Sequence, residues 1–165
     1  MQVPIRKAGK YASVAPDPHL TPKKHEELVA ELNRLKDGLS RAALEVKRLA
    51  EMGDLSENAA YSIAKSKLRG MEERILALER HLKTAVVITS GSASGAVELG
   101  CTVTIELQGK QTTYTILGSS ETDPSRGIIS HLSPIGSALM GHRIGDMVTL
   151  RSANDEKAYT IVNIA

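Results

Sequence analysis

The chain has 165 residues, of which 41% are hydrophobic and 24% are charged, with a formal net charge of +2. This length suits one or two small domains around a modest hydrophobic core. The single cysteine, Cys101, can form neither an internal disulfide nor a cysteine-built zinc site, which suits a reducing compartment. Because no apolar run approaches about 18 residues and the first residues lack a hydrophobic signal core, we expect a soluble, cytoplasmic protein that binds no membrane.

The charge is unevenly divided along the chain. Residues 1–86 carry 16 basic and 12 acidic side chains, whereas residues 87–165 carry 5 and 7. Within the basic half, residues 1–19 hold three prolines and three basic residues with little periodicity, and we expect them to form a mobile basic arm. A basic N-terminal half is typical of a module that works beside nucleic acid.

Two runs of apolar residues with heptad spacing follow this arm. Thr21 and Pro22 fit an N-cap and first helical position, so the first helix is predicted to run to Met52, about 45 Å. Two such seams, joined by a few residues, can bury each other only by folding back antiparallel. We therefore predict a coiled-coil hairpin over residues 20–84 with its tip at 53–61. The two seams are Leu28, Leu32, Leu35, Leu39, Ala42, Val46 and Leu49, and Tyr61, Ala64, Leu68, Met71, Ile75, Leu78 and Leu82.

The tip carries two carboxylates, Asp54 and Glu57, that the seams do not require. Their spacing fits a capping box, in which both side chains satisfy the first amides of the second helix. A functional alternative is magnesium binding, but two carboxylates are too few to hold this ion alone. A metal site here would need further ligands from a partner or from a substrate phosphate. Spacing alone leaves both interpretations open.

The C-terminal half changes its period from helical to alternating. Short β-rich runs occupy residues 86–89, 101–107, 111–117, 147–151 and 158–164, with turns predicted at 108–109 and 153–155. Ser133 and Pro134 predict the start of a short helix that ends at Gly141. The glycine- and serine-rich segment 90–95 is flexible in composition, as a linker or a loop within the sheet domain would be. The whole pattern predicts an α+β protein, a helical hairpin followed by an antiparallel sheet domain with a short helix.

The tip segment Gly-Asp-Leu-Ser-Glu-Asn-Ala-Ala-Tyr, residues 53–61, closely resembles the tip signature of the Gre transcript-cleavage factors of bacterial RNA polymerase. The resemblance continues at residues 20–22 and 26–36, and it returns at residues 114–118, 129–130, 133–135 and 145–146. It implies that the hairpin enters the secondary channel of the polymerase and that residues 85–165 form an FKBP-like domain that docks on the channel rim. The single cysteine argues against the DksA type of channel regulator, which carries a zinc finger.

The resemblance also implies roles for the tip residues. Asp54 and Glu57 would help to hold the second catalytic Mg²⁺, shared with the polymerase, and to orient the attacking water. Asn58 and Tyr61 would support the tip, whereas Ala60 stands where many members have a further acid. The protein would then be no enzyme itself but would stimulate the nuclease activity of the polymerase. We expect a monomer whose partners are bacterial RNA polymerase and the 3′ end of the nascent RNA, with no metal bound in isolation.

Other candidate residues lie behind the tip and in the sheet domain. Lys65, Lys67 and Arg69 fall where the family carries a basic patch for extruded RNA, although a solvated helix face would look the same. The resemblance makes Ser133, Pro134 and Ile135 candidates for polymerase docking. The five histidines, at positions 19, 25, 81, 131 and 142, show no ligand-like spacing, so we expect exposed or locally bonded roles.

Two functional hypotheses follow. The first is a transcript-cleavage factor, and the second is a channel-binding homologue that regulates polymerase without supporting cleavage. Retention of Asp54 and Glu57 favours the first, while a nucleoside-diphosphate-kinase regulator of related fold would have a shorter hairpin. The sequence does not separate a GreA-like from a GreB-like cleavage pattern. Prolyl isomerase activity is not expected, because active FKBP pockets are lined with aromatic rings and this chain has no Phe or Trp.

Overall fold

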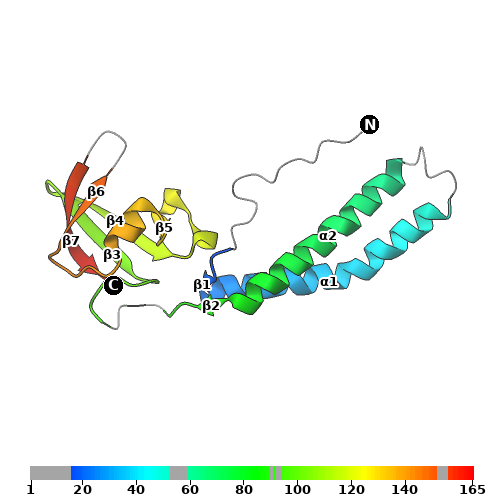
Figure 1. The fold of residues 1–165 in the computed structure, drawn as a ribbon, viewed down its shortest axis with the longest axis horizontal. Coiled ribbons are helices and arrows are strands. Elements are labelled where there is room, and N and C mark those ends of the chain that lie inside the picture. Colours follow the sequence, from blue (N-terminus) through cyan, green and yellow to red (C-terminus); the bar gives the residue numbers. More distant parts are fainter. Residues whose placement is uncertain (1–15, 53–58, 90, 92–93, 152–155) are drawn as a thin grey trace, which may run out of the picture.

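The computed structural model describes residues 16–52, 59–89, 91, 94–151 and 156–165. A long helical hairpin extends from one side of a small β-sheet domain (Figure 1). This arrangement confirms the predicted mixed α+β class. Within the described residues, no helix is both long and apolar enough to cross a membrane.

The hairpin consists of α1 (Pro22–Ala50) and α2 (Ala59–Thr84), which run antiparallel. Thr21 is the N-cap of α1, as predicted, because its hydroxyl accepts a 3.2 Å hydrogen bond from the amide of Lys24. Glu51 caps the other end of α1, so the helix stops within two residues of the predicted end. Every member of both predicted apolar seams is buried or half-buried, which confirms the coiled-coil pairing.

Ion pairs also bridge the two helices. Arg74 of α2 makes a two-pronged contact with Glu31 of α1, at 2.8 and 3.0 Å. Lys36 approaches Glu79 to 2.6 Å. These side chains are between 29% and 51% exposed, so each pair contributes at most about 1 kcal/mol, and most of the pairing energy comes from the apolar seam.

The sheet domain contains a five-stranded sheet in the order β5-β4-β3-β7-β6. Four of these strands match the runs predicted from the sequence, and β5 was not predicted. All neighbouring strands are antiparallel except β4 and β5, which are parallel. The predicted helix is α3 (Pro134–Leu139), which starts at the expected N-cap. The strands are β3 (Thr102–Leu107), β4 (Lys110–Leu117), β5 (Ile128–Ser130), β6 (Met147–Arg151) and β7 (Glu156–Ile164), and two single-turn 3₁₀ helices, η1 (Ser119–Glu121) and η2 (Pro124–Arg126), link β4 to β5.

One face of this sheet forms the domain core. Val103 and Ile105 alternate inward along β3, and Leu139 of α3 packs on the same cluster without solvent exposure. The predicted turn between β3 and β4 is confirmed, because Gln108 and Gly109 both have positive φ, as a two-residue hairpin turn requires. The other predicted turn, at 153–155, lies outside the described residues.

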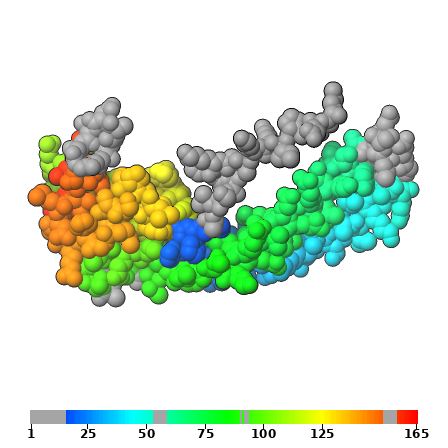
Figure 2. Space-filling view, viewed as in Figure 1, coloured from blue at the N-terminus to red at the C-terminus, as the bar shows by residue number. Residues whose placement is uncertain are grey.

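A small two-stranded sheet joins the hairpin to the sheet domain. In it, β1 (His19–Leu20) pairs in parallel with β2 (Val86–Val87). Leu20 is fully buried against Leu28 and Leu78 at the base of the hairpin. Residues 16–19, which the sequence analysis assigns to the basic arm, therefore take part in the fold, whereas residues 1–15 lie outside the described residues. Figure 2 shows this first described segment, in blue, between the hairpin and the sheet domain.

Candidate functional site

The two helix ends that flank the predicted tip, at Ala50 and Ala59, lie at the end of the hairpin farthest from the sheet domain. The C-terminal end of α1 and the N-terminal end of α2 meet the chain segment that contains Asp54, Glu57 and Asn58 (Figure 1). These three residues lie outside the described residues, so their roles remain predictions. What the structure provides is the support, a rod about 43 Å long, calculated from the 29 residues of α1.

Tyr61, the fourth predicted tip residue, is half-buried in the first turns of α2. The ammonium group of Lys65, one helical turn further on, lies 5.7 Å from the centre of the Tyr61 ring. This distance permits a cation–π contact, worth about 0.5–1 kcal/mol at an exposed site. The contact holds the Lys65 side chain along the helix surface, and its charge remains open to solvent.

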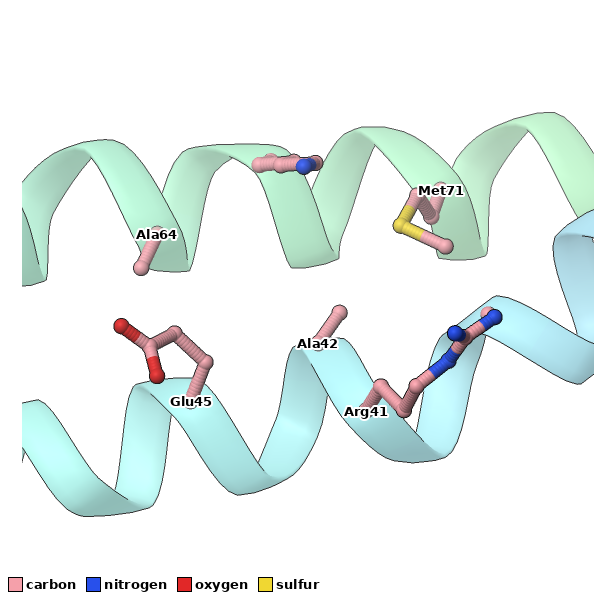
Figure 3. Close-up of a pocket in the computed structure, with 7 residues that line it drawn as sticks. Arg41, Ala42, Glu45, Ala64 and Met71 are labelled. Atoms are coloured by element: carbon pink, nitrogen blue, oxygen red, sulfur yellow. The ribbon is translucent and has the colours of Figure 1, made fainter.

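Lys67 faces a different direction from Lys65. It lines an open groove between the helices, where Ala64 and Met71 of α2 face Ala42 of α1 (Figure 3). The groove is also lined by Gly38, Arg41 and Glu45. Small side chains on both helices leave this hollow, and Lys67 adds a positive charge to its wall.

Arg69 points along the same face as Lys65, because the two residues are one turn apart. Its guanidinium pairs with Glu73 at 3.3 Å, and both side chains are more than two-thirds exposed. Such an exposed pair contributes at most about 1 kcal/mol. The structure therefore divides the predicted basic row into one exposed face with Lys65 and Arg69 and one groove with Lys67.

The three predicted docking residues in the sheet domain have clear structural roles. The Ser133 hydroxyl donates to the carbonyl of Ser130 at 2.7 Å and accepts from the amide of Gly136 at 3.0 Å. Ile135 packs against the domain core, and Pro134, the first residue of α3, is exposed. Of the three, Pro134 is the residue whose side chain is most available to a partner.

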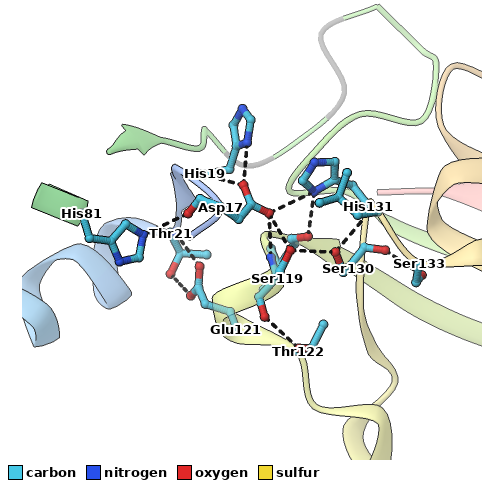
Figure 4. A network of polar contacts seen from close by, with 12 residues as sticks. Asp17, His19, Thr21, His81, Ser119, Glu121, Thr122, Ser130, His131 and Ser133 are labelled. Carbon is cyan, nitrogen blue, oxygen red and sulfur yellow. Dashed lines mark hydrogen bonds and ion pairs between the residues drawn. The ribbon is translucent and has the colours of Figure 1, made fainter. Parts of the chain in front are cut away.

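The polar cluster at the junction was not anticipated from the sequence. Asp17 lies at its centre, and its carboxylate accepts hydrogen bonds from both the hairpin side and the sheet domain (Figure 4). The Ser119 amide and hydroxyl donate to one carboxylate oxygen at 2.7 and 2.9 Å. The His19 amide, at 3.1 Å, and the His19 ring, at 2.9 Å, bond to the other oxygen.

This environment determines the charge of Asp17. Burial by itself would raise its pKa, but the hydrogen bonds from Ser119 and His19 outweigh burial and lower the pKa to about 2. Only 3% of the Asp17 side chain is exposed. The junction therefore contains a nearly buried carboxylate that stays ionised throughout the physiological pH range.

Two further contacts connect the hairpin to the sheet domain. Glu121 of η1 accepts hydrogen bonds from the amide of Thr21, at 2.8 Å, and from its hydroxyl. An acidic side chain of the sheet domain thus lies at the N-terminus of α1, where the helix dipole favours negative charge. On the other side of the junction, the buried ring of His81 bonds to the backbone carbonyl of Asp17 at 2.9 Å.

Gly118 is the last residue of the segment 114–118, and the packing around it explains why this position is a glycine. A Cβ atom at this position would lie 2.1 Å from the carbonyl oxygen of His19. The backbone before η1 therefore packs directly on β1, and only glycine allows this approach.

The sequence analysis found no ligand-like pairing among the five histidines, and the structure corrects this for two of them. His19 and His131 face each other, with ring centres 5.4 Å apart and nearly perpendicular planes. The Nδ1 atoms of both rings approach Asp17, at 2.9 and 3.5 Å. This pairing could not be predicted, because the two histidines are far apart in the sequence and lie in different parts of the fold. The Asp-Pro-His spacing at 17–19 was the one available signal.

The fold places the chain in a class of proteins in which a long helical hairpin projects from a small sheet domain. Comparisons with known proteins identify the family. Residues 19–87 match the model "Transcription elongation factor, N-terminal", and residues 92–165 match "Transcription elongation factor, GreA/GreB, C-term". The chain therefore belongs to the GreA/GreB family of transcription elongation factors.

Two GreA proteins agree with this assignment. The GreA of Geobacillus kaustophilus is 40% identical over 149 residues, covering 88% of this chain and 94% of the relative. The GreA of Thermomicrobium roseum is 42% identical over 122 residues, covering 72% and 78%. Among solved structures, that of the transcription factor Gfh1 is 30% identical, covers 92% of this chain and 99% of its own, and has a TM-score of 0.44.

Proposed function

We propose that this protein stimulates the cleavage of backtracked nascent RNA by bacterial RNA polymerase. In this proposal the hairpin enters the secondary channel and brings Asp54 and Glu57 to the catalytic centre. The main support is family membership together with two carboxylates in the short sequence that links two antiparallel helices, the first about 43 Å long. A protein that only blocked the channel would need the rod but no carboxylate pair.

The two tip residues contribute oxygen ligands, the type that magnesium prefers. Because magnesium takes six oxygen ligands, Asp54 and Glu57 would complete a site whose other ligands belong to the polymerase. The bound ion would supply charge stabilisation at the phosphate. A carboxylate that is not used as a ligand can orient the attacking water by accepting its hydrogen bond.

The sheet domain would dock on the polymerase and set the direction of the hairpin. Leu132 is 67% exposed and lies two residues before Pro134, which is also exposed. These side chains offer an apolar contact at the start of α3. The hydrogen bonds of Asp17 and Glu121 then connect the docked domain to the root of α1.

The cations behind the tip would neutralise the phosphates of extruded RNA. Lys65 and Arg69 share one exposed face, and Lys67 lies in the groove. A single RNA strand that follows one face can therefore contact two of the three cations more easily than all of them.

The decisive experiment compares three isosteric changes near the tip. Asp54→Asn and Glu57→Gln remove a charge from the proposed site, whereas Glu51→Gln removes an exposed charge at the end of α1. In a cleavage assay on backtracked elongation complexes, the first two changes should slow cleavage roughly 10²-fold or more, because metal and general-base contributions are of this size. The Glu51 control should cleave at nearly the wild-type rate, and all three variants should bind polymerase alike.

Two results would contradict the proposal. Wild-type rates in both tip variants would restrict Asp54 and Glu57 to helix capping. A wild-type protein that binds polymerase but releases no RNA would be a channel-binding regulator. The purified protein alone should hydrolyse no RNA, because its two carboxylates cannot hold magnesium without further ligands.

A further inference from the structure

Three potential metal ligands converge at the junction between the hairpin and the sheet domain. The ligand atoms of Asp17, His19 and His131 all lie within 4.8 Å of one another. Both rings direct Nδ1 towards the same carboxylate (Figure 4). In the part of the chain that the structure describes, this is the one group of three such residues.

We propose that Asp17, His19 and His131 form a binding site for a divalent transition-metal ion of the zinc type. Two imidazoles and one carboxylate form a donor set that suits zinc, whereas magnesium and calcium prefer oxygen ligands. Zinc–nitrogen bonds of about 2.0–2.1 Å in a tetrahedron place neighbouring ligand atoms roughly 3.3 Å apart. Nδ1 of His19 lies 2.9 Å from Oδ1 of Asp17, and Nδ1 of His131 lies 3.5 Å from Oδ2. Each distance is close to this value, and the two carboxylate oxygens face different rings, so an ion between the rings would draw one of the rings towards a shared oxygen.

Charge and hydration also suit a cation. The Asp17 carboxylate is ionised and brings one negative charge to the site. The hollow above it is lined by Pro16, Pro18, Ser119, Ser120 and Leu132 together with the three ligands, and none of these residues carries a positive side chain. Solvent in this hollow can supply the fourth ligand, as water does in zinc sites with three protein ligands. For binding, each imidazole would carry its proton on Nε2, so that the ion replaces the present contacts of Nδ1 with Asp17 and, for His131, with the carbonyl of Leu117 at 3.4 Å.

Ser119 would act as a positioning residue. Its amide and hydroxyl both donate to Oδ2 of Asp17, which fixes the direction of the carboxylate. Removal of a residue that orients a metal ligand in this way usually weakens metal affinity by about 10- to 100-fold.

The location gives the ion a definite effect. Asp17 and His19 precede α1, whereas His131 follows β5 in the sheet domain. A bound ion would therefore connect the root of the hairpin to the domain that is proposed to dock on polymerase. It would stabilise the junction, and this effect does not depend on the cleavage activity of the tip.

The test uses the full chain after removal of metal with a chelator. Zn²⁺ affinity is measured by competition with a chromophoric chelator, with Mg²⁺ as the comparison ion, and the thermal midpoint is followed in parallel. The variants are His19→Gln and His131→Gln. His142→Gln is the matched control, because His142 also pairs with a carboxylate, that of Asp146 at 3.3 Å, but belongs to no group of three ligands among the described residues. A variant with both Asp54→Asn and Glu57→Gln excludes binding at the tip.

The wild-type protein, the His142 control and the tip variant should each bind one equivalent of Zn²⁺ and unfold at a higher temperature with it. His19→Gln and His131→Gln should weaken Zn²⁺ binding by more than about 100-fold, and Ser119→Ala by about 10- to 100-fold. The proposal would be overturned if the His19 and His131 variants bound Zn²⁺ as tightly as the wild type, or if the wild type bound no Zn²⁺.

A second measurement uses only the wild-type protein, so its result does not depend on whether the variants fold. In the histidine NMR spectrum of the wild type, Zn²⁺ should shift the ring signals of two of the five histidines. The affected pair should be in mutual contact, as His19 and His131 are. Equal shifts of all histidines, or of none, would show weak surface binding only.

Discussion

Substitution of Gly118 by alanine tests the packing of the junction most directly. The added Cβ would lie 2.1 Å from the carbonyl oxygen of His19, a backbone atom that cannot rotate away. A normal contact needs about 1 Å more, so β1 and the segment before η1 must separate. Insertion of a methyl group into a packed site typically costs about 1–3 kcal/mol.

Gly70 provides the matched control for this substitution. It lies on the exposed side of α2, and its added Cβ would have no atom within 4 Å. The same change from glycine to alanine should therefore stabilise the hairpin by about 0.5–1 kcal/mol through helix propensity. The two alanine variants should thus differ in the sign of their effect.

Urea unfolding followed by far-UV circular dichroism measures both effects, since the chain has no tryptophan to report by fluorescence. With an m-value of about 2 kcal/mol/M, Gly118→Ala should lower the unfolding midpoint by roughly 0.5–1.5 M. Gly70→Ala should raise it by roughly 0.3–0.5 M. An unchanged midpoint for Gly118→Ala would refute the close approach between β1 and the segment before η1.

Three further predictions concern the junction and the tip. Glu121→Gln should destabilise the protein by about 1–2 kcal/mol, measured by urea unfolding, because it weakens two charge-assisted hydrogen bonds at the N-terminus of α1. Asp17→Asn, with chelator present, should lower the free energy of unfolding by about 2 kcal/mol at pH 7 in the same assay. Because the folded-state pKa of Asp17 is about 2 and the ordinary value is 3.8, this difference from wild type should persist above pH 4 and fade as the pH falls towards 2. Combined replacement of Lys65, Lys67 and Arg69 by alanine should slow cleavage of deeply backtracked complexes more than shallow ones, and a defect that is insensitive to salt would argue against phosphate contacts.

The sequence predicted the parts of the fold that depend on local patterns. Both seams of the hairpin follow from heptad spacing, and the start of α1 follows from Thr21 and Pro22. The turn at Gln108 and Gly109 has a strong local signal as well. By contrast, β5 is three residues long and pairs in parallel with β4, so neither its length nor its pairing leaves a periodic signal.

The junction could not be predicted for a different reason. Asp17 and Ser119 are separated by 102 positions, and only the folded chain brings them together. The same holds for His19 and His131, which are unremarkable when read one at a time. At the tip, the resemblance to a family supplied the roles of Asp54 and Glu57, because capping explains their spacing equally well.

The stiffness of the junction matters because of the length of the hairpin. If the sheet domain is held by polymerase, a rotation of one degree at the root of α1 moves the far end of a rod of about 43 Å by about 0.8 Å. Displacements of about 1 Å at a reacting centre can reduce rates by about 10²-fold. Fully satisfied contacts around Asp17 and Glu121 restrict this rotation, and a metal ion at His19 and His131 would restrict it further. Variants at the junction should therefore reduce cleavage more than polymerase binding, although they lie at the opposite end of the hairpin from the tip.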